Sequence, residues 1–185
     1  MARPREFDII RALDGAMDIF WRQGFKATNL PELLDAMDLS RGSFYKAFDD
    51  KESVYLNALD RYDAVVVAGT VAMLEGCEEP RASDCIQKMF APSSARARGC
   101  FICNAMVELA PENPQVADRV NAMAERLKNG VIGVLGKHGN GTSDRHRSEL
   151  ADVVLHLYFG HQAMGKSGAG HQDWQERLRR ILGEE

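Results

Sequence analysis

The sequence predicts an all-α protein of about nine helices, in which an N-terminal three-helix helix-turn-helix domain precedes a larger helical domain. Apolar residues recur at intervals of three, four and seven along most of the chain, the spacing of a buried helix face. No segment alternates apolar and polar residues as a half-buried strand would. Residues 30–51, LPELLDAMDLSRGSFYKAFDDK, read as two short helices joined by a tight turn.

The composition indicates a globular chain without a general affinity for nucleic acid. Of its 185 residues, 45% are hydrophobic, which is ample for a buried core. The formal net charge is −4, and the first 62 residues hold nine Lys/Arg against eleven Asp/Glu, a net charge of −2. Any DNA binding must therefore come from a local arrangement of basic side chains, with weak non-specific binding. These side chains are Arg3, Arg5, Arg41, Lys46 and Lys51.

Targeting signals and cysteine usage indicate a cytoplasmic protein. The N-terminal sequence MARPREFD has no apolar run behind its basic residues, and no segment approaches the ~18 consecutive apolar residues of a membrane span. Four cysteines in a chain of this length do not form a secreted disulfide framework. We therefore expect all thiols to be reduced at rest.

The first part of the chain predicts a basic arm followed by one long helix. Residues 1–5 form the arm, and the helix spans about Glu6 to Gln23 before Gly24 ends it. The inner stripe of this helix consists of Ile9, Leu13, Ala16, Met17 and Phe20. This helix supports the two short helices that follow.

Capping residues set the limits of the two short helices. The first runs from about Leu30 to Met37, with Asn29 as its N-cap and Glu32 as the acid that completes a capping box. The second runs from about Arg41 to Phe48 behind the N-cap Ser40.

A helix pair of this kind can place the N-terminal residues of its second helix against base edges in the major groove. Gly42 keeps the start of that helix slim, and the Tyr45 hydroxyl can bind a phosphate. Lys46 offers a charge to a base edge or phosphate, and Lys51 can reach another phosphate. A helical hairpin inside a core is the alternative for this segment taken alone.

Linked motifs over about the first 55 residues resemble the DNA-binding domain of the TetR (tetracycline-repressor-like) family. They are FWRQGF at 20–25, ATN at 27–29, LSRGSFYKAF at 39–48 and KE at 51–52. The resemblance implies an all-helical homodimer that binds a palindromic operator, with a variable C-terminal domain that senses a small molecule. Carried over by position, it implies DNA contacts from Thr28, Arg41, Gly42, Ser43, Tyr45, Lys46 and Lys51. Asp38 replaces the glycine usual in the turn, and we expect it to adopt the left-handed conformation.

The rest of the chain predicts a connecting helix and five further helices. A helical pattern from about Asp50 to Glu75 ends at a break over 76–80. The expected organisation is a DNA-binding domain at 1–50, a connecting helix at 51–75 and a ligand-sensing and dimerisation domain at 76–185. Five helices follow at about 82–90, 100–110, 114–137, 150–164 and 174–181, with loops at 139–145 and 167–171.

The last two helices are amphipathic, and in the TetR family such a pair packs against the same pair of a second subunit. Binding to a palindromic operator also requires two subunits, because its half-sites lie ~34–36 Å apart and one subunit cannot span them. The alternative is that these helices only close their own domain.

Two cysteines near residue 100 form a second candidate site. Cys100 falls in the first turn of a helix, where the helix dipole and the nearby Arg96 and Arg98 favour a thiolate. Cys103 lies one turn away, close enough for a disulfide or for joint capture of a soft metal ion. Core packing would equally explain both cysteines. We interpret Cys77 and Cys85, near a helix junction, as structural.

The segment GCFICN at 99–104 resembles the start of the ligand domain in one TetR subgroup, which has a Gly-Cys-x-x-x-Asn sequence there. Members resembling NemR, AcuR and ComR respond to electrophiles or oxidants, acrylate, and copper. The resemblance implies that Cys100 senses an effector, and it leaves the effector open.

A small-molecule pocket is a better interpretation of the C-terminal part than a metal site. His156 and His161 are five residues apart, so they do not share a helix face, and no metal site is predicted. Mostly apolar walls with few polar groups are typical of small-ligand cavities. The candidate lining residues are Phe90, Phe101, Met106, Met123, Leu127 and Tyr158. Ordinary core packing is the alternative for each of them.

We expect neither enzymatic activity nor a cofactor. A thiol oxidoreductase built on the Cys-x-x-Cys sequence needs a strand-helix-strand setting, and the sequence predicts none. A helical protein-interaction module without DNA binding is the remaining alternative. The sequence therefore predicts a regulator that leaves its operator when an effector, or modification of Cys100, swings the helix at 51–75.

Overall fold

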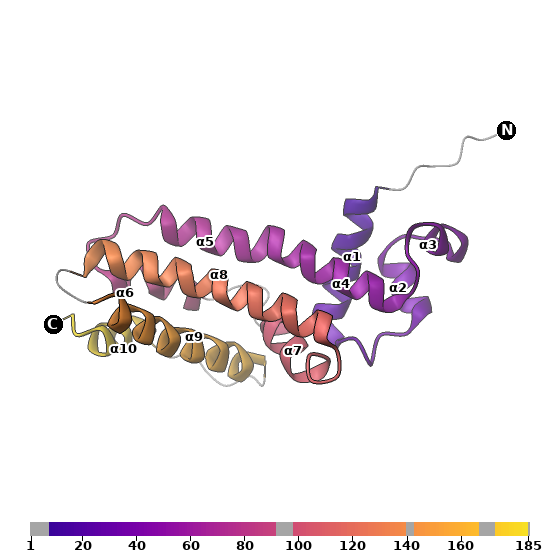
Figure 1. Cartoon of the computed structure of the whole chain (residues 1–185). Coiled ribbons are helices and arrows are strands. Elements are labelled where there is room, and N and C mark those ends of the chain that lie inside the picture. The colour runs from indigo at the N-terminus through magenta and orange to yellow at the C-terminus, as the bar shows by residue number, and fades with distance from the viewer. Residues whose placement is uncertain (1–7, 92–97, 140–142, 167–172, 185) are drawn as a thin grey trace.

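The computed structural model describes residues 8–91, 98–139, 143–166 and 173–184, and all regular elements within those ranges are helices (Figure 1). The molecule is elongated. Helices α1 (Ile9–Gln23), α2 (Leu30–Ala36) and α3 (Arg41–Ala47) form one end, and a helical bundle extends from them. None of the described helices is long and apolar enough to cross a membrane.

One long helical rod joins the two ends of the molecule (Figure 1). It consists of α4 (Lys51–Tyr62), a π-helical segment (Asp63–Val67) and α5 (Ala68–Glu75), where the sequence predicted a single helix. The chain continues as α6 (Ala82–Ile86), which ends in a 3-10 turn (Gln87–Phe90).

The remaining helices are α7 (Phe101–Glu108), α8 (Pro114–His138), α9 (Asp144–Lys166) and α10 (Trp174–Leu182). With the rod and the α6 segment counted once each, the described residues form nine helical units, as predicted. Helix α9 begins within the segment that the sequence assigned to a loop over 139–145. The expected basic arm at 1–5 and the loop at 167–171 lie outside the described residues.

Local signals placed the helix-turn-helix correctly. Asn29 and Glu32 form a reciprocal capping box at the start of α2, and the Ser40 side chain accepts from the Ser43 backbone N–H at the start of α3. Asp38 has φ 54°, the left-handed conformation predicted for the turn. Helix α1 begins behind Asp8, whose carboxylate accepts from the N–H groups of Ile10 and Arg11.

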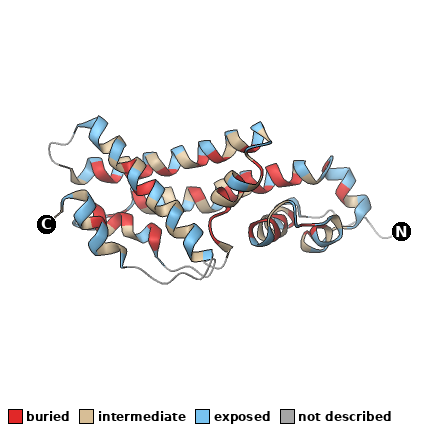
Figure 2. Cartoon of the chain, turned by 90° about the horizontal axis from the view of Figure 1, so that it is seen from below, coloured by how far each residue is buried: buried red, intermediate tan, exposed pale blue. Residues whose placement is uncertain are grey.

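A single continuous core runs through the molecule, and buried residues lie on the helix sides that face one another (Figure 2). At the junction of the two ends it is aromatic. Tyr55 and Tyr62 on α4 both contact the Phe101 ring edge-on, with centroids 5.6 and 5.5 Å apart. Tyr55 also contacts Phe20, and Tyr62 contacts Trp21, both on α1. Helix α7 therefore packs directly against the helix-turn-helix end as well as against the bundle.

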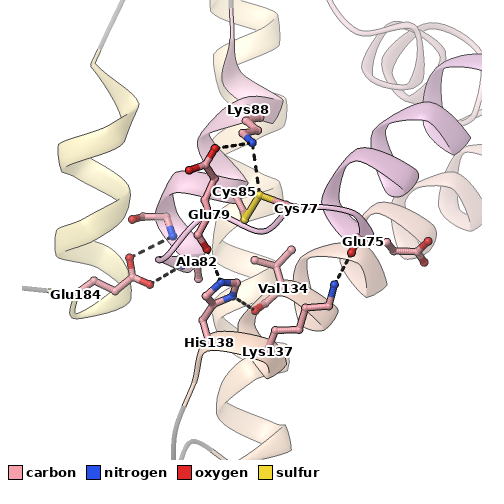
Figure 3. Close-up of a disulfide and its surroundings, with 11 residues drawn as sticks. Glu75, Cys77, Glu79, Ala82, Cys85, Lys88, Val134, Lys137, His138 and Glu184 are labelled. Carbon is pink, nitrogen blue, oxygen red and sulfur yellow. Dashed lines mark hydrogen bonds and ion pairs between the residues drawn. A yellow bond between two sulfur atoms is a disulfide. The ribbon is translucent and has the colours of Figure 1, made fainter.

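Cys77 and Cys85 form a disulfide with an S–S distance of 2.07 Å (Figure 3). The expectation that all thiols are reduced is therefore wrong for this pair. Their Cα atoms are 5.8 Å apart, within the range that a disulfide spans, because the turn after α5 brings Cys85 in α6 close to Cys77. Their place near a helix junction had suggested only a structural role, because the sequence does not reveal the direction of that turn.

Candidate DNA-binding surface and effector site

Helix α3 is anchored on one side and exposed on the other. Phe44 is fully buried and Phe48 is 7% exposed, so these two rings fix the helix against the core. Arg41 and Lys46 are exposed, and Tyr45 is 56% exposed with its ring edge-on to Phe44. The short helix thus presents two cations and one phenol on its outer face.

The first turn of α3 has space around it. A Cβ atom added at Gly42 would meet one side-chain atom within 4 Å, the hydroxyl of Ser40 at 4.0 Å. Packing within the described residues therefore gives no reason for glycine at this position. The Ser43 hydroxyl lies 3.0 Å from that of Ser40, so its position is fixed by the N-cap.

Thr28 has an internal role in this conformation, in contrast to the DNA contact that the family resemblance implied. Its side chain is 1% exposed, and its hydroxyl donates to the Gly24 carbonyl oxygen at 2.6 Å. This bond stabilises the turn between α1 and α2. The family resemblance implied a DNA contact from the residue type at this position, whereas the fold directs the Thr28 hydroxyl into the protein.

Lys51 begins α4 beside that turn, and its ammonium nitrogen lies 4.1 Å from the centroid of the Phe25 ring. Burial lowers the pKa of Lys51, and the nearby Glu108 carboxylate acts in the opposite direction. The lysine is therefore a partly buried cation at the edge of the surface formed by α3.

Glu108, at the end of α7, clasps the turn after α1. Its two carboxylate oxygens accept from the backbone N–H groups of Phe25 at 2.9 Å and Lys26 at 2.7 Å. Gly24 allows this approach, because a Cβ atom there would lie 2.6 Å from a Glu108 oxygen. These are charge-assisted bonds, which are stronger than neutral ones.

A second set of contacts holds the start of α7 to α1. The Trp21 indole N–H donates to the Gly99 carbonyl oxygen at 2.9 Å. The Asn104 amide donates to the carbonyl oxygens of Trp21 at 3.3 Å and Arg98 at 3.1 Å. Together with Glu108 they form what we call the α7 clasp: Trp21, Gly99, Asn104 and Glu108. In the sequence, Asn104 stood out only as part of the GCFICN motif. No local pattern predicts its contacts with residues about 80 positions away.

Cys100 is the N-cap residue of α7 and is 2% exposed. The neighbouring Cys103 thiol lowers the pKa of Cys100, and the backbone N–H groups of Cys103 and Ile102 and the Tyr62 phenol act in the same direction against burial. Cys100 in turn raises the pKa of Cys103, to which burial also contributes. The pair therefore favours one thiolate, located on Cys100.

The cause of the lowered Cys100 pKa differs in part from the predicted one, because the neighbouring Cys103 thiol contributes most. The Arg98 guanidinium forms an ion pair with Asp18 and lies 4.5 Å from the centroid of the Trp21 ring. It is therefore committed to α1, and Arg96 lies outside the described residues. The N-terminus of α7 does contribute, through its backbone N–H groups.

Cys100 lies in the wall between two cavities. One, of about 240 Å³, is also lined by Trp21, Tyr62, Lys88, Tyr158 and Gln162. The other, of about 380 Å³, is also lined by Gln23, Cys103, Asn104, Glu108 and Lys166. The first is lined mainly by residues of the bundle, and the second borders the α7 clasp. A small molecule in either cavity could therefore contact the thiol.

The six predicted pocket residues fall in different places. Tyr158 lines the cavity of about 240 Å³. Met106 lines a third cavity, of about 320 Å³, with Phe159 and the Lys128–Asp152 ion pair. Phe90, Phe101, Met123 and Leu127 are all buried in the core. Phe101 packs between Tyr55 and Tyr62 in the aromatic part of the core.

No cluster of three or more His, Cys, Asp or Glu side chains suited to a metal ion occurs among the residues described. His161 accepts from the Trp174 indole N–H at 3.1 Å, a contact that joins α9 to α10. Helices α9 and α10 carry three of the exposed large apolar side chains, Val153, Met164 and Ile181.

Comparison with known proteins identifies the family. Residues 12–58 match the family described as bacterial regulatory proteins, tetR family. The chain is 34% identical to the HTH-type transcriptional repressor ComR of Escherichia coli (strain K12), an alignment that covers 98% of this chain and 88% of ComR.

Solved structures agree with this. The chain resembles a cysteine-substituted form of the TetR family transcriptional regulator CifR, complexed with 26 bp double-strand operator DNA, at a TM-score of 0.81 and 26% identity over 98% of this chain and 99% of that one. The reduced form of E. coli NemR shares the fold at a TM-score of 0.73 and 20% identity, over 94% of this chain and 92% of NemR. The chain therefore belongs to the TetR family of DNA-binding transcriptional regulators.

Proposed function

We propose that the protein is a cytoplasmic repressor that binds a palindromic operator as a homodimer and leaves it when an effector occupies the site around Cys100 or modifies that thiol. The observation that supports operator binding best is the exposed face of α3, with Arg41, Tyr45 and Lys46 held outward by two buried phenylalanines. The similarity to CifR in complex with operator DNA supports the same reading.

In this proposal each region of the chain has a separate task. Residues 1–50 read DNA, 51–75 connect, and 76–185 sense the effector and dimerise. Arg41, Gly42 and Ser43 approach base edges, while Tyr45, Lys46 and Lys51 contact phosphates. Thr28 acts indirectly by holding the turn before α2.

Dimerisation through α9 and α10 follows from geometry and surface chemistry. The two half-sites of a palindrome lie ~34–36 Å apart, so two recognition helices are needed. Val153, Met164 and Ile181 supply exposed apolar contacts on these two helices. A two-fold interface would bury them in both subunits.

We further propose that the α7 clasp transmits the signal. Cys100 is the N-cap of α7, and the same helix holds α1 through Trp21 and the turn at 24–26 through Glu108. Displacement of α7 would therefore move α1 and Lys51 directly, in addition to any swing of the long rod. A ligand achieves this through its differential affinity for the two states, and the expected coupling is ~1–3 kcal/mol, or about 5–150-fold in operator affinity.

The test is fluorescence anisotropy with DNA from the region upstream of the protein's own gene. Reduced wild-type protein, Cys100→Ser and Cys103→Ser are each measured before and after brief treatment with N-ethylmaleimide. We expect treatment to weaken binding in wild type and Cys103→Ser but not in Cys100→Ser. Weakening of equal size in Cys100→Ser would refute sensing by that thiol.

Two alternatives remain as outcomes of the same experiment. Absence of operator binding by the reduced wild-type protein would favour a protein-interaction module without DNA binding. Thiol-oxidoreductase activity has no support from the family, whose members are regulators.

A further inference from the structure

The Cys77–Cys85 disulfide lies at the opposite end of the bundle from the helix-turn-helix, separate from Cys100 (Figures 1 and 3). Cys77 follows α5 and Cys85 is within α6, so the bond ties the end of the long rod to α6. Cys77 is 7% exposed and Cys85 is fully buried. Cys77 is therefore the less buried residue of the pair.

A cation lies beside the Cys77 sulfur. The Lys88 ammonium nitrogen is 3.6 Å from the Cys77 sulfur and 3.0 Å from a Glu79 carboxylate oxygen (Figure 3). A positive charge at this distance attracts an incoming thiolate and stabilises a thiolate that forms on Cys77. Both effects increase the rate of exchange between a disulfide and small thiols.

The segment around the disulfide stays attached when the bond opens. Lys137 donates to the Glu75 carbonyl oxygen at the end of α5, and His138 lies 2.9 Å from the Glu79 carbonyl oxygen. The Glu184 carboxylate accepts from the N–H groups of Ala82 and Ser83 at the start of α6, at 2.9 and 3.2 Å (Figure 3). These contacts do not involve sulfur, so the local fold survives without the covalent bond.

We propose that Cys77–Cys85 is a second thiol–disulfide site of this protein, which exchanges with low-molecular-weight thiols independently of Cys100. A small thiolate attacks the Cys77 sulfur and forms a mixed disulfide. The bond to Cys85 breaks, and Cys85 leaves as a thiolate that takes a proton from solvent. A second small thiolate then attacks the outer sulfur of the mixed disulfide and releases Cys77 as a thiolate beside Lys88.

The reaction balances. Two small thiols lose two electrons and become one small disulfide, while the protein disulfide gains two electrons and becomes two thiols. The same steps in reverse, with a small disulfide as the oxidant, restore the Cys77–Cys85 bond. No other reactant is required.

The redox state of this pair also affects the site around Cys100, a consequence that rests on the proposed function. Lys88 and Met89, in the 3-10 turn after α6, line the same cavity of about 240 Å³ as Cys100. The disulfide holds that turn to the end of α5. Without the bond, the non-covalent contacts described above still hold the segment but let this wall of the cavity fluctuate more, which exposes the Cys100 thiol more often.

The exchange is tested in a Cys100→Ser/Cys103→Ser protein, which has no other cysteines. The protein is equilibrated in buffers with increasing ratios of reduced to oxidised glutathione, quenched with acid, alkylated and weighed by mass spectrometry. We expect a transition from zero to two alkylated thiols. Peptide mapping of wild-type protein reports the same bond without those substitutions.

Lys88→Met in the same background tests the role of the charge. We expect reduction about five-fold slower at low salt, with a smaller effect at high salt, as for one unit charge near 4 Å in water. Lys26→Met, an exposed lysine on the turn after α1, is the matched control and should leave the rate unchanged. A pair that does not exchange, or a Lys88→Met rate equal to that of the control, would overturn the proposal.

The effect on Cys100 is tested separately. The rate of N-ethylmaleimide labelling of Cys100 is compared between Cys103→Ser protein with the disulfide intact and the same protein carrying Cys77→Ser and Cys85→Ser. We expect labelling several-fold faster without the disulfide, and equal rates would refute the link between the sites. Neither experiment uses DNA, so their failure is distinguishable from failure of the proposed function.

Discussion

Glu108 provides the sharpest test of the α7 clasp. Glu108→Gln keeps the size of the side chain but replaces one acceptor oxygen with an NH₂ donor. That donor would face a backbone N–H, either that of the half-buried Phe25 or that of the exposed Lys26. One of the two bonds is therefore lost, and the other changes from charged to neutral.

The expected cost follows from these two changes. A hydrogen bond to a charged group contributes about 1.5–3 kcal/mol and a neutral one about 0.5–1.5 kcal/mol. Rotation of the amide will leave the exposed Lys26 N–H to water, which reduces the penalty. We therefore expect Glu108→Gln to lower the free energy of unfolding by about 1–2 kcal/mol. Operator affinity should fall as well, because the turn beside Lys51 loses its support.

Glu112→Gln is the matched control. Glu112 lies 3.6 Å from the Lys26 ammonium in the same region, but both side chains are exposed, and such pairs contribute about 0–1 kcal/mol. Urea unfolding followed by circular dichroism gives the stability of both variants, and anisotropy gives their operator affinity. The reasoning fails if Glu108→Gln is as stable as wild type, or if the two variants lose equal amounts.

Three further predictions concern α3 and Cys100. Lys46→Ala should weaken operator binding on all sequences alike and reduce the salt slope of log K by about 1, measured by anisotropy at several salt concentrations; an unchanged slope would remove Lys46 from the phosphate contacts. Gly42→Ala should leave thermal stability equal or higher, because alanine favours a helix and the site has space, yet weaken operator binding; full affinity would show that DNA does not approach this point. The rate at which Cys100 reacts with N-ethylmaleimide should reach half its maximum below the pKa of an ordinary thiol, since a lowered pKa leaves more thiolate at lower pH, and Cys103→Ala, which removes the largest cause, should move the midpoint upward.

The features that the sequence predicted well depend on interactions between residues that are close together in the chain. The N-caps Asn29 and Ser40 and the left-handed Asp38 each act within a few residues, so their signals lie beside the structure they determine. The outward side of α3 follows from the same short-range pattern.

Features that depend on contacts between distant residues could not be predicted from the sequence, for a physical reason. Glu108 reaches Phe25 across 83 positions, and nothing in the local sequence of either residue specifies the other. Thr28 has the right residue type for a DNA contact, but tertiary packing turns its hydroxyl toward Gly24. The Cys77–Cys85 bond depends on a turn whose direction neither spacing nor compartment reveals.

The π-helical segment Asp63–Val67 joins α4 and α5, whose buried faces would not lie on the same side of one regular α-helix. In a uniform α-helix at 3.6 residues per turn, the buried residues Tyr62 and Leu74 would point about 120° apart. The wider turn of a π-helix takes up part of that difference and lets both face the core. Deletion of one residue within 63–67 should restore a regular α-helix and leave Tyr62 and Leu74 about 20° apart, so that both still face the core. The π-helical segment therefore accommodates one residue more than a regular α-helix would need to keep the buried faces of α4 and α5 on the same side.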